Sequence, residues 1–187
     1  MNQALKNNIG KDGTLFVVWG WILFINAFFL NYLSDQLFLS HGMMSTVRIL
    51  RIVLPIIGLA YTVYYLLIQR NKQSTKGTQL GYVWGALFIS MVLVNLIQFN
   101  VSQRINFELQ HPLFMVLSAL AVIVTGRIVH CRSMIFGGAV FAVLAYISSH
   151  FGLNDQMLIE SIGWVVAFII PGHILLSNNH KDPTYIY

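Results

Sequence analysis

Four polar residues within long apolar stretches are the first candidates for chemistry: Arg51, Asn95, His150 and Glu160. A polar side chain in hydrocarbon is costly and needs a partner or a water-lined cavity. Arg51 and Glu160 lie at similar depths in two predicted membrane spans, so an ion pair between them is geometrically allowed. With His150 and Asn95 they would line an outward-facing polar pocket for a proton, an ion or a small solute. In the structural alternative, Arg51 extends to the lipid headgroups and Glu160 lies in a hydrated rim.

A second candidate cluster lies toward the opposite ends of the predicted spans. The sequence Pro171-Gly172-His173 predicts a break near the end of the last span. Such a break would place His173 beside His130 and Arg127, where an imidazole could relay protons near neutral pH. The alternative is a helix terminator followed by an interfacial histidine.

No motif for a known catalytic chemistry is present. The sequence lacks H-E-x-x-H, G-x-S-x-G, a P-loop and a dinucleotide fingerprint. The single cysteine, Cys131, excludes a disulfide framework and a cysteine-based metal site. A b-type haem would draw on His111 and His150, or on His130 and His173, but all four lie near predicted interfaces. We therefore expect no catalytic residue, no cofactor and no metal.

The composition identifies the class of protein that must position these residues. Of 187 residues, 57% are hydrophobic and only 9% are charged, whereas soluble domains carry about 25% charged residues. The mean hydropathy is +0.70. These values exclude an ordinary soluble enzyme and a disordered tail. They predict a polytopic membrane protein whose surroundings are lipids, and its pI near 9.5 does not indicate nucleic-acid binding.

Six segments are long enough to cross a bilayer, which takes about 20 helical residues. They predict an all-α bundle in which residues 1–187 form a single transmembrane domain. The predicted spans are 14–33, 49–68, 80–99, 112–129, 133–151 and 157–176. Residues 69–79 are predicted to be a loop and residues 152–156 a tight turn.

The basic residues near the span ends predict the orientation. With the N-terminus inside, one side of the membrane carries most of the lysines and arginines, which favours cytoplasmic termini and a multi-pass protein of the inner membrane. That side has Lys6, Lys11, Arg70, Lys72, Lys76, Arg127, Arg132 and Lys181, and the other has Arg48, Arg51 and Arg104.

Small and polar residues predict which helix faces meet. In the second span one side carries a stripe that should face the bundle interior. That stripe consists of Arg51, Pro55, Gly58, Thr62, Tyr65 and Gln69. Gly77, Gly81 and Gly85 in the third span, and Gly138 with Ala142 in the fifth, recur every fourth residue, a spacing that lets helices approach closely.

Two short motifs carry a resemblance to a known family. The first span opens with Trp19-Gly20-Trp21 and is preceded by Asn7-Asn8. The last span closes with Pro171-Gly172-His173-Ile174-Leu175. The chain resembles a family of uncharacterised six-span integral membrane proteins common in Bacteroidota. The resemblance implies a membrane location and a fold style, and no reaction.

We therefore expect a non-catalytic accessory subunit, scaffold or modulator, working with a membrane-protein partner or as a homo-oligomer. The main alternative is a small transporter or an ion or proton pathway built on Arg51, Asn95, His150 and Glu160. An intramembrane enzyme or a haem redox protein is the third reading. A loss of flux in Glu160→Gln with normal expression would favour transport.

Overall fold

The computed structural model describes the backbone of residues 3–37, 41–69 and 75–180, and the side chains of residues 13–37, 42–65 and 79–177. The described chain is all-helical, without a strand. Its elements are α1 (Gln3–Ile25), the π-helix η1 (Asn26–Leu33), α2 (Ser34–Gln36), α3 (His41–Gln69), α4 (Thr75–Ser102), α5 (Phe107–Val129), α6 (Arg132–Ser148), α7 (Leu153–Trp164), the π-helix η3 (Val165–Ile169) and α8 (Ile170–His180).

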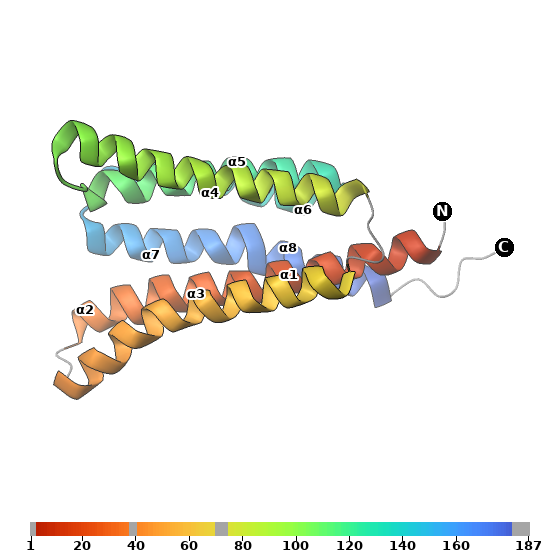
Figure 1. Cartoon of the computed structure of the whole chain (residues 1–187), viewed down its shortest axis with the longest axis horizontal. Helices are drawn as coiled ribbons and strands as arrows, with labels where there is room; N and C mark the ends of the chain where they lie inside the picture. The colour runs from red at the N-terminus through yellow and green to blue at the C-terminus, as the bar shows by residue number, and fades with distance from the viewer. Residues whose placement is uncertain (1–2, 38–40, 70–74, 181–187) are drawn as a thin grey trace.

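These elements form an elongated bundle with two distinct ends (Figure 1). We call the end with α2 and the starts of α3, α5 and α7 the loop end. The start of α1 and the end of α8 lie together at the opposite end, the terminal end. In the described chain, five helical stretches are long and apolar enough to cross a membrane, and α6, with 17 residues, is shorter. The prediction of an all-helical chain with several helices long and apolar enough to span a membrane is thus confirmed.

The core lies among α1, α5, α6 and the last helix, which runs continuously through α7, η3 and α8. Aromatic rings fill its centre. The Phe141 and Trp164 ring centroids lie 4.8 Å apart, and Phe168 lies 5.2 Å from Trp164 and 6.0 Å from Phe16. By contrast, α4 packs mainly on α5, and α3 packs on α1 and η1. Figure 1 shows α3 and α4 on opposite margins of the bundle, with α7 and α8 between them.

Two adjacent glycines allow α6 to approach both of its neighbours. A Cβ at Gly137 would lie 2.5 Å from the carbonyl oxygen of Val166 in the last helix. A Cβ at Gly138 would lie 2.7 Å from the side chain of Ile123 in α5. Any side chain at either position would force the helices apart, so this part of the bundle depends on glycine. The small-residue prediction for Gly138 is therefore confirmed.

The predicted break at Pro171-Gly172-His173 is wrong, and so is the helix terminator, because α8 continues to His180. A proline normally disrupts a helix because it lacks an N–H and its ring collides with the carbonyl four residues earlier. Here that carbonyl belongs to Ala167 in η3, whose wider turns displace the carbonyls from their α-helical positions. Pro171 and Gly172 are buried, and a Cβ at Gly172 would lie 2.7 Å from Val17 of α1.

Two predicted boundaries also change. The last helix begins at Leu153, with Gly152 as its N-cap, so most of the predicted turn 152–156 is helical. The first helix begins at Gln3, eleven residues before the predicted span. Of the predicted loop 69–79, residues 70–74 lie outside the described chain, and α4 already begins at Thr75.

The predicted inward face of the second span is confirmed in its described part. Gly58 is the only buried residue among the described side chains of α3, and a Cβ there would lie 2.9 Å from Ile22 of α1. One turn later, the indole Nε1 of Trp19 donates a hydrogen bond to the Thr62 hydroxyl at 2.8 Å. The spacing of small and polar residues therefore identified the side of α3 that meets α1.

Candidate functional site

The first polar group at the loop end joins α3 to the first helix. Arg51 donates from Nε to the Leu30 carbonyl at 2.6 Å and from Nη2 to the Ser34 hydroxyl at 2.9 Å. Its Nη2 also lies 3.6 Å from the Asp35 carboxylate. In the reverse direction, the Asn26 amide donates to the backbone carbonyl of Arg51 at 3.1 Å. Arg51 is thus held by η1 and α2.

These contacts satisfy backbone groups that η1 exposes. The Asn31 amide donates to the carbonyl of Asn26 at 2.7 Å and to its side-chain oxygen at 2.9 Å. The Arg51 guanidinium likewise donates a hydrogen bond to the Leu30 carbonyl. An unsatisfied carbonyl costs several kcal/mol in hydrocarbon, so the polar residues here stabilise the irregular helix and need no ligand to explain them.

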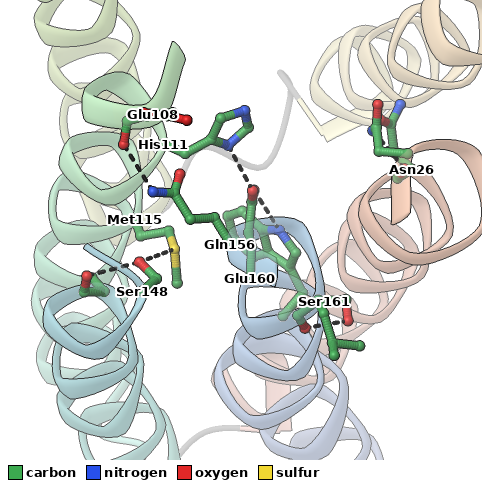
Figure 2. A network of polar contacts seen from close by, with 12 residues as sticks. Asn26, Glu108, His111, Met115, Ser148, Gln156, Glu160 and Ser161 are labelled. Atoms are coloured by element: carbon green, nitrogen blue, oxygen red, sulfur yellow. Dashed lines mark hydrogen bonds and ion pairs between the residues drawn. The ribbon is translucent and has the colours of Figure 1, made fainter. Parts of the chain in front are cut away.

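The second polar group joins α5 to α7 (Figure 2). Nδ1 of His111 lies 3.0 Å from Oε2 of Glu160, and the indole of Trp164 donates to Oε1 of the same carboxylate at 3.0 Å. The side chains of His111 and Glu160 are 24% and 17% exposed. One turn nearer the loop end, the Gln156 amide donates to the carbonyls of Glu108 and Phe151.

Helix geometry explains why these residues meet. Both α5 and α7 begin at the loop end and run in the same direction. Glu108 and His111 are three residues apart on α5, and Gln156 and Glu160 are four apart on α7. These spacings place each pair on one helix face. Glu160 and Gln156 therefore form two successive links to α5, the first to the His111 side chain and the second to the backbone carbonyl of Glu108.

The third polar group joins α4 to α5. The Gln110 amide donates to the side-chain oxygen of Asn95 at 2.8 Å, and the Asn95 amide donates to the Met91 carbonyl at 3.0 Å. One turn later, the side-chain oxygen of Gln98 accepts from the backbone N–H of Asn106 at 3.2 Å. Asn95 thus belongs to the contact between α4 and α5.

The four predicted pocket residues therefore each have a separate local environment. Arg51 pairs with Asp35 and Glu160 with His111; no interaction among the described side chains joins Arg51 to Glu160. The reason is that α1 and η1 pack against both α3 and α7 and lie between them. His150 is exposed in the α6–α7 turn, where its ring lies 5.2 Å from that of Tyr146.

The partner of Glu160 was missed by sequence reasoning, although a signal existed. His111 immediately precedes the predicted fourth span, on the same side of the membrane as Glu160 in the sixth. Depth alone cannot choose between Arg51 and His111, because it does not say which helices are neighbours.

The predicted cluster of Arg127, His130 and His173 is not joined in the described structure. His130 ends α5 in a left-handed conformation (φ 58°), and its N–H donates to the Arg127 carbonyl at 3.3 Å. All three side chains are exposed. His173 lies on α8, which packs mainly on α1, and the helix is not broken to turn His173 toward His130.

No group of three or more histidine, cysteine, aspartate or glutamate side chains in the described part of the chain could hold a metal ion. Comparison with known proteins gives no match to a protein-family model, a curated protein or a solved structure. The resemblance to the Bacteroidota family is therefore a proposal that depends on the Trp19-Gly20-Trp21 and Pro171-Gly172-His173 motifs.

Proposed function

We propose that this chain is a six-span protein of the bacterial inner membrane, with both termini in the cytoplasm, that acts as a non-catalytic subunit, scaffold or modulator of another membrane protein. One observation carries the proposal: no residue of α4 from 79 to 102 is buried within the chain. By contrast, half of the most apolar stretch of α5, and half of that of the last helix, is buried.

The margins of the bundle offer two docking faces. On α4, exposed side chains occupy most of the circumference and include Tyr82 at 74% and Phe88 at 68%. On α3, Ile52 is 65% exposed and Ile56 is 56% exposed. A second membrane protein could pack against either helix without disturbing the core.

The glycines of α4 favour a helix as the partner. A Cβ at Gly81 or Gly85 would meet nothing within 4 Å, whereas a Cβ at Gly138 of α6 would collide with α5. Small residues at four-residue spacing allow close helix approach in membranes, where dispersion and weak hydrogen bonds drive association. Gly81 and Gly85 have this four-residue spacing, and no helix of the described chain packs against them.

The polar residues support this proposal over transport. Arg51 and Asn95 form hydrogen bonds that join neighbouring helices, and the first helix lies between α3 and α7. A solute pathway would need these groups to converge on one passage.

Site-specific photo-crosslinking in the native host tests the proposal. A photoreactive residue replaces Phe88 on α4 or Ile56 on α3, and a matched probe replaces Phe136 on α6, which is 71% exposed on a core helix. We expect a discrete adduct with another polypeptide from α4 or α3 and none from Phe136. An adduct at twice the 21.2 kDa chain mass would instead indicate a homo-oligomer. No protein adduct from α3 or α4 would overturn the proposal.

A further inference from the structure

The contacts of Glu160 determine which nitrogen of His111 carries hydrogen. The indole nitrogen of Trp164 can only donate, so Oε1 of Glu160 accepts from it. When Glu160 is ionised, its carboxylate accepts hydrogen bonds at both oxygens, and the Nδ1 atom that lies 3.0 Å from Oε2 then carries the second hydrogen. The neutral imidazole then keeps a free lone pair on Nε2.

Charges of both signs lie at the loop end around this pair. On the two helices that carry the pair, the other charged groups near the loop end are acidic, Glu108 on α5 and Asp155 on α7. From the first helix and α3, Asp35 and Arg51 face each other and pair, and Arg48 is exposed near the start of α3. The only charged residue of α6 is Arg132, at the terminal end; Arg104 lies in the α4–α5 turn and His150 in the α6–α7 turn.

An unused acceptor lies one turn from Glu160. Gln156 is 1% exposed, and both of its hydrogen bonds to carbonyls use the amide nitrogen. Its Oε1 is buried and has no hydrogen-bond partner among the described atoms. A buried acceptor without a donor is costly, so the neighbourhood of Glu160 has one hydrogen-bond acceptor more than it has donors.

We propose that His111 and Glu160 form a proton-binding dyad at the loop end. Glu160, fixed by Trp164, orients the imidazole, and Nε2 takes a proton from hydronium in the adjacent water. A new N–H bond forms at Nε2, a water molecule is released, and the positive ring is neutralised by the Glu160 carboxylate. The hydrogen bond between α5 and α7, which was charge-assisted only on the carboxylate side, thereby becomes charge-assisted on both sides. This site is independent of the proposed docking function, since it needs no partner protein.

Nitrogen NMR of the full chain in lipid nanodiscs, with ¹⁵N-labelled histidine, tests the dyad directly. His111→Gln assigns the His111 signals among those of the six histidines. In the unmodified protein at alkaline pH, we expect Nδ1 protonated and Nε2 bare. Finding the opposite tautomer would overturn the proposal, and this result does not depend on any variant at Glu160.

Glu160→Gln gives a sharper outcome. Trp164 must still donate to the side-chain oxygen at position 160, so the new amide nitrogen faces Nδ1 of His111. A donor there requires Nδ1 to accept, and we expect the tautomer to reverse to Nε2–H. His150→Gln, at the same end of the bundle, is the matched control and should leave His111 unchanged. An identical His111 tautomer in Glu160→Gln and the unmodified protein would contradict the dyad.

Acidification tests proton uptake. As the pH falls, we expect Nε2 of His111 to become protonated while Nδ1 stays protonated. His150, which is exposed, serves as the internal reference for an accessible imidazole. If Nε2 of His111 remained bare when His150 was fully protonated, the dyad would not be a proton-binding site.

Discussion

Helices α4 and α5 are neighbours of similar length and apolar composition, yet they have opposite relations to the core. No described side chain of α4 is buried, whereas nine residues of α5 are. The difference lies in the small residues: a Cβ added at Gly126 on α5 or Gly138 on α6 would lie within 3 Å of the neighbouring helix, whereas one added at Gly81 or Gly85 on α4 would meet nothing within 4 Å. In lipid, apolar character does not bring helices together; close-fitting surfaces do.

The largest expected effect comes from removing a core ring. Phe141→Ala empties a site that is 0% exposed beside Trp164, and we expect a loss of ~3–5 kcal/mol in the free energy of unfolding. The matched change Phe88→Ala on α4 removes a ring that is 68% exposed and should cost much less. Unfolding by denaturant in detergent micelles measures both. Equal losses would remove the distinction between core and margin.

Adding one methyl group at matched glycines is the next test. Gly137→Ala places a Cβ 2.5 Å from the Val166 carbonyl, and we expect destabilisation of ~1–3 kcal/mol. Gly85→Ala meets nothing and should stabilise α4 by up to about 1 kcal/mol through helix propensity. Midpoints of thermal unfolding should therefore move in opposite directions. A fall in both would indicate that α4 already packs against something within the chain.

A double-mutant cycle on His111→Gln and Glu160→Gln measures the link between α5 and α7. We expect a coupling energy of ~1 kcal/mol between the two side chains, which lies within the range found for side-chain hydrogen bonds between membrane helices. The matched cycle on Arg51→Gln and Glu160→Gln should give a coupling close to zero because α1 and η1 separate these residues. A larger coupling for Arg51 than for His111 would contradict the pairing described above.

The smallest expected effect concerns the margin formed by α3. Trp19→Phe removes the hydrogen bond to Thr62 while keeping an aromatic ring against Gly58. A loss of about 0.6 kcal/mol is expected from the average for such bonds in membranes. Thr62→Val should give a similar loss, and the double variant should lose little more stability than either single variant. Unfolding free energies of the two single variants and the double variant decide this.

Much of the fold could be predicted because it follows from local patterns. Apolar runs gave the helices, and the spacing of Gly58 and Thr62 gave the face of α3 that meets α1. The partner of Glu160 could not be predicted, because Arg51 and His111 both lie near the same side of the membrane and only the order of helices in space separates them. The continuation of the last helix through Pro171 was also missed, because it depends on a π-helix that no local sequence signal marked.

We propose that α3 and α4 are the surfaces against which another protein packs. Native mass spectrometry of the chain, purified in mild detergent from its own host, tests it most directly. We predict the 21.2 kDa chain bound to a different polypeptide. Gly85→Leu on α4 should weaken the binding of that polypeptide, and Phe136→Leu on α6 should leave its binding unchanged. A spectrum containing only the chain or its multiples, unchanged by either substitution, would contradict the claim.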